Sequence, residues 1–152
     1  MRLGILVVFI VILDQLSKSY IQANMRLGES IPLIHYVFHI TYILNPGAAF
    51  GLLADQTFFF IGLAVTMILA FIYFYPAIKR ESAWMKLGIG LLVGGAIGNL
   101  VDRIQIGKVV DFFDFRIWPI FNVADIGIVC GAFIIIVAAF FEKDKSEVNT
   151  HG

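Results

Sequence analysis

Charged residues are scarce in this chain: 11 basic and 11 acidic side chains make up only 14% of its 152 residues. A soluble domain carries about 25% charged residues. The remainder is 60% hydrophobic, with a mean hydropathy of +0.91, which excludes an ordinary soluble domain and indicates an integral membrane protein. The net charge of zero offers no basic surface to a nucleic acid. The length suits one domain over residues 1–152.

Several catalytic signatures are also missing. The single cysteine, Cys130, excludes an intramolecular disulfide, and we expect it to be a small buried hydrophobe. No H-E-x-x-H or G-x-S-x-G motif occurs, and His35 and His39 have no acidic neighbour. We therefore expect neither a zinc peptidase site nor a serine-hydrolase elbow.

Long apolar runs take the place of these motifs. A membrane-spanning helix needs ~20 mostly apolar residues, and four segments qualify, at about 3–21, 57–75, 84–103 and 123–141. Pro76 is expected to end the second. The first resembles a signal peptide, but Asp14 interrupts it and no A-x-A-like site follows. We therefore expect it to be a retained helix.

Four spans place both termini on one side of the membrane, and the distribution of basic residues selects that side. One face carries Arg2, Lys79, Arg80, Lys86, Lys143 and Lys145, whereas the other carries Arg26, Lys108 and Arg116. This bias predicts cytoplasmic termini, with segments 22–56 and 104–121 outside the cytoplasm. The polar tail, about 143–152, is expected to be disordered because it has little apolar surface to bury.

The first external segment shows strand-like alternation. Between Ile34 and Leu44, aromatic and β-branched residues alternate in a period of two, and Asn45-Pro46-Gly47 follows as a turn. We predict a small sheet within about 25–55, with the face that includes Tyr36 and Tyr42 at the lipid interface.

Glycines are spaced by four residues in the last two apolar segments. They lie at Gly90, Gly94 and Gly98 and at Gly127 and Gly131. Small residues at this spacing let helices approach closely. We expect these two helices to pack together, which would bring Asp125 near the loop that holds Asp111.

Five carboxylates lie in or beside the apolar runs: Asp14, Asp102, Asp111, Asp114 and Asp125. Charge at membrane depth is costly unless it is paired or faces an internal cavity. Asp111 and Asp125 each end a short apolar run. If they lie close together, the pKa of one rises and the pair shares a proton, as in an aspartic peptidase. The alternative is two unrelated interfacial carboxylates; Asp114 receives no role beyond an interfacial one.

Other polar residues could support this pair. Asn99, Asp102 and Arg103 share one helical face. Arg103 could pair with Asp102 or Asp14, or contact a backbone carbonyl or a lipid phosphate, and a purely structural ion pair is the alternative.

A second polar pair lies on the first apolar segment. Asp14 and Lys18, four residues apart, can neutralise each other as a structural pair. The segment from Asn45 to Phe50 is either a simple turn or a place where a peptide backbone approaches.

Together these motifs closely resemble the lipoprotein signal peptidase (signal peptidase II) family. The matching blocks, in order, are Asp14-x-x-x-Lys18, Asn45-Pro46-Gly47-Ala48-Ala49-Phe50, the run from Gly94 to Arg103, Val109-Val110-Asp111-Phe112 and Phe121-Asn122-Val123-Ala124-Asp125. Each block is weak alone, but five in order are specific.

The resemblance implies a fold and an activity. The fold would be mainly α, with four transmembrane helices and a small extracytoplasmic β-cradle. The protein would be an intramembrane aspartic endopeptidase of the bacterial cytoplasmic membrane, with its active site at the extracytoplasmic face. It would remove the signal peptide from diacylglyceryl-modified prolipoproteins by cleaving before the lipidated cysteine.

The resemblance also implies site residues and partners. Asp111 and Asp125 match the catalytic pair. The matching supporting or substrate-binding positions are Asp14, Lys18, Asn45, Gly47, Asn99, Asp102, Arg103, Asn122 and Ala124. No metal, organic cofactor or nucleic acid is implied; lipidated prolipoproteins and membrane lipids are the expected partners of a monomer.

Two other functions use the same residues differently. Intramembrane carboxylates also mark the pathways of proton-coupled carriers, although the chain shows no repeated halves. A non-catalytic membrane scaffold would make Asp111 and Asp125 dispensable.

Overall fold

The computed structural model describes residues 3–47 and 55–150, with side chains described as far as residue 141. The helices are α1 (Leu3–Asn24), α2 (Thr57–Ile78), α3 (Ala83–Ile106) and α4 (Val123–Thr150). The strands are β1 (Ser30–Ile34), β2 (Phe38–Asn45) and β3 (Val109–Asp114). The first two residues, segment 48–54 of the predicted cradle region and residues 151–152 lie outside the described ranges.

Within the described ranges, four helices are long and apolar enough to cross a membrane. Their outward faces carry large apolar side chains, and Ile78 is the one buried side chain recorded on α2. Exposing such an apolar surface to water would be unfavourable, whereas contact with the hydrocarbon chains of a bilayer is favourable. The predicted fold class, a mainly α membrane protein with a small sheet, is confirmed.

All four helices extend beyond their predicted ends, α1 as far as Asn24. Pro76 lies inside α2, which continues to Ile78, because a proline this close to the end removes only one terminal hydrogen bond. Helix α3 continues to Ile106 and stops where Gly107 adopts a positive φ of 73°. The tail expected to be disordered is helical to Thr150, because extending an existing helix avoids the cost of nucleation.

The glycines of α3 serve two interfaces rather than one. A side chain at Gly90, Gly94 or Gly98 would collide with α1, so this stripe faces α1 and not mainly α4 as predicted. The α4 interface instead uses Gly88 and Gly95 of α3, together with Gly127 and Gly131 of α4. Because helix α3 rotates about 100° per residue, small residues on two of its faces let it approach both neighbours closely.

The sheet has the order β1-β2-β3 and is antiparallel throughout. The single strand predicted over residues 34–44 is in fact the end of β1, a turn at residues 35–37 and most of β2. Tyr36, with a φ of 63°, occupies that turn and is 90% exposed, whereas Tyr42 is buried. The third strand comes from the segment that was expected to be a loop, so Asp111 lies in a strand.

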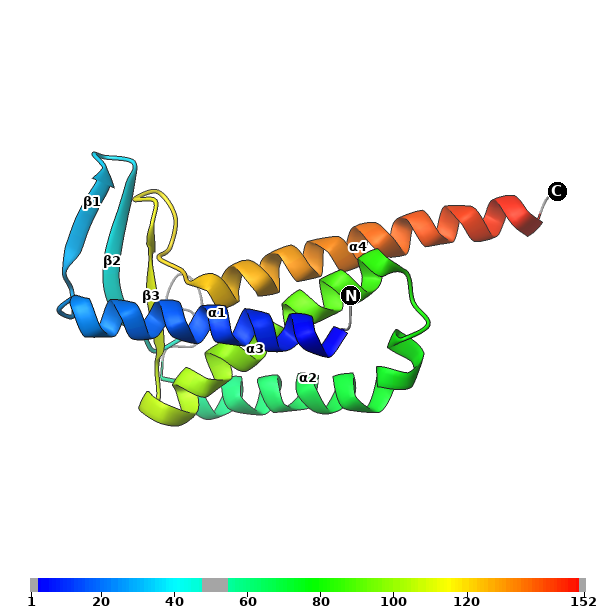
Figure 1. Cartoon of the computed structure of the whole chain (residues 1–152), viewed down its shortest axis with the longest axis horizontal. Helices are drawn as coiled ribbons and strands as arrows, with labels where there is room; N and C mark the ends of the chain where they lie inside the picture. The colour runs from blue at the N-terminus through cyan, green and yellow to red at the C-terminus, as the bar shows by residue number, and fades with distance from the viewer. Residues whose placement is uncertain (1–2, 48–54, 151–152) are drawn as a thin grey trace.

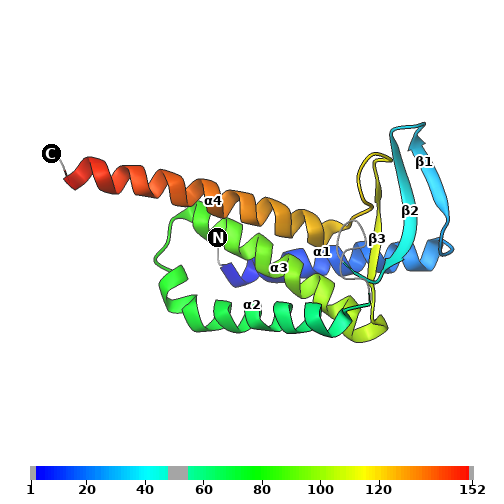
Figure 2. The same cartoon turned by 180° about the vertical axis from the view of Figure 1, so that it is seen from behind.

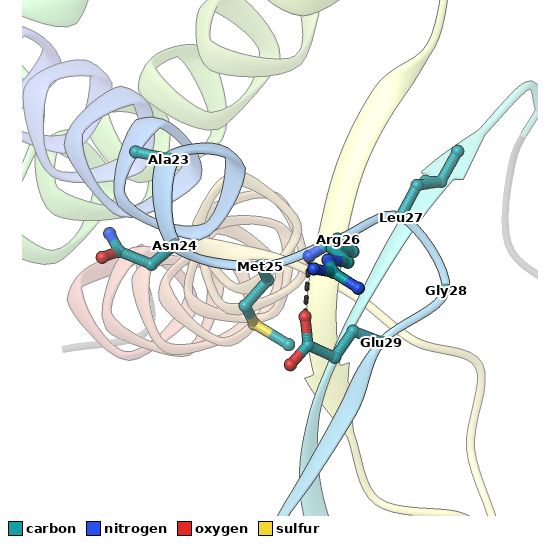
Figure 3. A pocket seen from close by; sticks show the side chains of 7 residues that line it. All are labelled: Ala23, Asn24, Met25, Arg26, Leu27, Gly28 and Glu29. Carbon is teal, nitrogen blue, oxygen red and sulfur yellow. Dashed lines mark hydrogen bonds between the residues drawn. The ribbon is translucent and has the colours of Figure 1, made fainter.

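The sheet lies at one end of the helices, beside the C-terminal ends of α1 and α3 and the N-terminal ends of α2 and α4 (Figure 1). Both ends of the described chain lie away from the sheet, as the reverse view also shows (Figure 2). An open hollow between α1 and β1, lined by residues 23–29, includes a hydrogen bond from the Arg26 amide to Glu29 (Figure 3). The predicted site residues lie elsewhere, where helices and sheet meet.

Candidate active site

Asp111 lies in the middle of β3 and is only 1% exposed. Its Oδ2 accepts a hydrogen bond from Asn45 Nδ2 at 2.8 Å, and its Oδ1 accepts one from Asn122 Nδ2 at 2.7 Å. Burial, reinforced by the charge of Asp125, raises the pKa of Asp111 to about 7, although the two asparagines oppose the shift. Asp111 can therefore gain or lose a proton near neutral pH.

Asp125 lies in the first turn of α4, across from Asp111. Its Oδ1 accepts from Asn99 Nδ2 at 2.8 Å, and its Oδ2 accepts from the Asn122 backbone amide at 3.1 Å. The Asp125 amide donates in return to Asn122 Oδ1 at 2.9 Å, which forms a reciprocal cap at the start of the helix. Asn122 is thus in direct contact with both carboxylates.

Lys18 lies behind the pair as a fully buried cation, 1% exposed. Its ammonium group contacts Asp14 Oδ2 at 2.9 Å and Asp102 Oδ2 at 3.0 Å, and donates to Asn99 Oδ1 at 2.9 Å. These three contacts match the three protons of the ammonium group. The predicted Asp14–Lys18 pair is therefore present, with Asp102 as a third member.

The Lys18 cluster also holds the backbone beside each carboxylate. Asp102 Oδ2 accepts from the amide of Val110, the residue before Asp111, at 3.0 Å. Asp14 Oδ1 accepts from the amide of Ala124, the residue before Asp125, at 2.9 Å. Charge-assisted bonds of this kind are stronger than neutral ones, so the cluster fixes the approach of both strand and helix.

Gln15 completes this cluster and was not singled out from the sequence. Its Nε2 donates to Asp102 Oδ1 at 2.8 Å, to the Gly98 carbonyl at 3.1 Å and to Asp14 Oδ2 at 3.2 Å. The signal available in the sequence was its position next to Asp14 in an apolar run, where a polar amide needs a partner.

Arg103 is placed differently from the first expectation, because Asp102 pairs with Lys18 instead. The Arg103 guanidinium donates to the Gly47 carbonyl at 3.0 Å and lies 4.6 Å from the centre of the Phe60 ring. The backbone-carbonyl alternative is therefore the one realised, together with a cation–π contact. Gly47 in turn donates its amide to Asn45 Oδ1 at 3.0 Å, so the Asn45 turn reaches the site; its continuation through Ala48, Ala49 and Phe50 lies outside the described residues.

The two carboxylates open onto a cavity of about 640 Å³. Its remaining walls are mainly apolar and come from α2, α4 and the loop before α4, and Arg103 and Trp118 also line it. Cys130 lines this cavity and is exposed, contrary to the expected burial, because it faces away from the α3 interface. Across the described residues, no group of three or more His, Cys, Asp or Glu side chains could hold a metal ion.

The fold and this site define a class: a small membrane protein with one buried and one partly buried carboxylate at one end of an apolar cavity. The family model described as signal peptidase (SPase) II matches residues 6–141, and the chain belongs to this family. Family membership makes it a protease of the bacterial membrane.

Similar proteins agree with this membership. A lipoprotein signal peptidase of Pelotomaculum thermopropionicum is 45% identical over 146 residues, 96% of each chain. One from Desulfitobacterium hafniense is 48% identical over 139 residues, 91% of each chain. A solved structure titled as a bacterial membrane enzyme studied by the in meso method matches with a TM-score of 0.87 and 35% identity, covering 94% of this chain and 90% of that one.

Proposed function

We propose that this protein is an intramembrane aspartic endopeptidase that removes the signal peptide from diacylglyceryl-modified bacterial prolipoproteins. Cleavage would occur before the cysteine that carries the lipid. The family and the names of the relatives support the substrate class, and the chemistry rests on the residues of the site.

The observation that carries the proposal is an asparagine shared by two carboxylates, of which Asp111 is buried and Asp125 is partly buried. Asn122 binds Asp111 through its side chain and Asp125 through its backbone and side chain. The pKa of Asp111 is about 7, raised by burial and by the nearby charge of Asp125, so the pair is suited to sharing one proton near neutral pH. One site then contains both an acid and a base.

The reaction follows from this protonation state. The ionised carboxylate takes a proton from a water molecule while the oxygen of that water attacks the scissile carbonyl carbon. At the same time, the protonated carboxyl group gives its proton to the carbonyl oxygen. The tetrahedral intermediate then collapses, the C–N bond breaks, and the leaving nitrogen takes the proton that came from water. One of the two hydroxyl groups of the intermediate gives its proton back to the carboxylate that had donated one, so the pair again holds a single proton.

The surroundings of the pair suit a lipid-linked peptide. The apolar cavity wall between α2 and α4 accepts acyl chains or an apolar signal segment. The sheet lies at the same end of the helices as the pair and offers an edge beside which an extended segment can lie (Figure 1). We place this end at the extracytoplasmic face, with cytoplasmic termini, from the bias in basic residues.

The decisive experiment is cleavage of a lipidated prolipoprotein by purified protein in detergent, with Asp111→Asn and Asp125→Asn compared with the unmodified chain. We expect each substitution to lower kcat by at least ~10³-fold, because the pair can no longer hold one proton and one negative charge. Thermal unfolding and gel filtration check that both variants stay folded. Full processing by either folded variant would contradict the assignment of Asp111 and Asp125 as the catalytic pair.

A matched substrate tests the lipid requirement. The same precursor without its diacylglyceryl group should be cut much more slowly, because its contacts with the apolar cavity are lost. Equal rates would rule out lipid-dependent recognition. If the unmodified protein cleaves neither precursor, a carrier or a scaffold becomes the better description.

A further inference from the structure

The sheet contains a second polar network, which the proposed reaction does not use. Asp114, at the end of β3, is 3% exposed; its Oδ2 accepts from Thr41 Oγ1 at 2.8 Å and from Arg116 Nη1 at 2.9 Å, and its Oδ1 accepts from the Arg116 amide at 2.8 Å. Ser30 Oγ lies 2.7 Å from Thr41 Oγ1 and 3.0 Å from His39 Nδ1. One continuous chain of hydrogen bonds therefore links β1, β2 and β3.

The chain has a single direction. Burial acts to raise the pKa of Asp114, but the bonds from Thr41 and Arg116 outweigh it and hold the pKa below its usual value. An ionised carboxylate only accepts, so the Thr41 hydroxyl must give Asp114 its one proton and accept the proton of Ser30. The His39 Nδ1 then has to donate to Ser30. Each donor in this series therefore has one acceptor, and the last acceptor is the ionised carboxylate of Asp114.

This network lies at an irregularity of the β2–β3 ladder. The backbone partners on its two sides are Ile40 with Phe113 and Ile43 with Asp111. Two residues of β2, the first of which is Thr41, therefore lie opposite one residue of β3. This is a β-bulge, and Thr41 is part of it.

The bulge determines which residue meets Asp111. With the extra residue in place, Asn45 pairs with Val109, and its side chain reaches Asp111 diagonally. Without the bulge, the regular register would place Asp111 opposite Tyr42. A slip of one residue exchanges the faces of a strand, so Asn45 and Asp111 would no longer share a face.

We propose that Asp114 is a positioning residue for the aspartic peptidase reaction: through Thr41 it holds the β2 bulge, and the bulge holds Asp111 in the register that the active pair needs. This proposal rests on the proposed function for its kinetic consequence, whereas its structural consequence can be measured without any substrate.

The main test is Thr41→Val, which keeps the branched shape but removes the hydroxyl, compared with Thr41→Ser, which keeps the hydroxyl. With lipidated precursor, we expect Thr41→Val to lower kcat by about tenfold with little change in KM, and Thr41→Ser to stay within about threefold of the unmodified chain. The pH profile of Thr41→Val should keep its shape, because the residual activity comes from molecules in the native register. A second variant, Asp114→Asn, should also lower kcat, because its neutral amide accepts more weakly.

The substrate-free measurement is hydrogen–deuterium exchange of the β3 amides. Exchange should be faster in Thr41→Val than in the unmodified chain, and unchanged in the control Thr66→Val, which removes an exposed hydroxyl that donates to the Gly62 carbonyl within α2. Unchanged β3 exchange together with an unchanged kcat in Thr41→Val, or a kcat equally low in Thr41→Ser, would overturn the positioning role. If exchange of the β3 amides is faster in Thr41→Val but the unmodified protein cleaves no precursor, the result would support the role of Asp114 in holding the strand register and would reject the peptidase function.

Discussion

The two carboxylates are held by very different kinds of structure. Asp125 lies in the first turn of α4, which packs against α3 through glycines that bring the two backbones into close contact. Asp111 belongs to a three-stranded sheet whose outer strand, β1, is exposed at all five positions. Close packing makes the helical side stiff. On the sheet side, Val110 and Phe112 of β3 pack in a small apolar core, but the carboxylate of Asp111 is positioned by individual hydrogen bonds. The site therefore joins a rigid half to a more adaptable half, and each half can be weakened separately.

The largest effect is expected from Lys18→Met, because Lys18 supports both halves. The substitution leaves Asp14 and Asp102 buried without their cation, a change that costs about 3–5 kcal/mol of stability. We expect a large loss of folded protein, measured as yield and as the midpoint of thermal unfolding in detergent. Lys108→Met, at an exposed lysine near the sheet, is the control and should unfold like the unmodified chain. A normal unfolding midpoint for Lys18→Met would contradict the central role of this cation.

An intermediate effect is expected from Gly95→Ala, which acts on the helical half alone. The new methyl group would collide with the Ala124 carbonyl oxygen, directly before Asp125. Overpacking of this kind costs about 1–3 kcal/mol, and kcat should fall as α4 shifts. Gly62→Ala on α2 is the matched control, because nothing lies within 4 Å of the added methyl group. If both variants unfold alike, close packing does not distinguish the halves.

The smallest effect is expected from Asn45→Ala, which acts on the sheet half alone. The bond from Asn45 stabilises the ionised form of Asp111, so its loss raises the pKa of Asp111 above about 7. Activity that needs the shared proton then persists to higher pH, and the alkaline limb of the kcat/KM profile moves upward while kcat falls about tenfold. Asn24→Ala, which removes an exposed bond to the Tyr20 carbonyl, should leave the profile in place. An alkaline limb that moves to lower pH would refute the sign of this interaction.

The helices were predictable because apolar length alone specifies a span in lipid. Strand β3 was not, since its Val-Val-Asp-Phe-Phe-Asp sequence lacks strict alternation and is buried at five of its six positions. A short apolar run of this kind cannot be distinguished by its sequence pattern from the end of a membrane helix. The sequence also could not predict that the glycines of α3 serve two interfaces. A spacing of four residues shows that small residues share one face of a helix, but not which neighbouring helix packs on that face.

The structure brings most of the predicted site residues together, but one of the expected pairings differs. Asp14 and Lys18 pair as their spacing predicted, yet Asp102 pairs with Lys18 rather than with Arg103, and Asn99 joins this cluster without having been expected there. Sequence proximity favoured the neighbour on the same helix, whereas the fold supplied a buried cation from another. Gln15 and the bulge at Thr41 needed the three-dimensional arrangement, since neither carries a charge or a motif.

Asn122 has a consequence for biosynthesis. It joins Asp111, 11 positions earlier in the chain, to Asp125, and the neighbouring bond from Ala124 to Asp14 spans 110 positions. A ribosome releases the early helices first, so a nascent chain that ends before residue 122 contains Asp111 but neither Asn122 nor Asp125. The contacts that join the two carboxylates can therefore form only after the start of the last helix has been made, late in the synthesis of the chain.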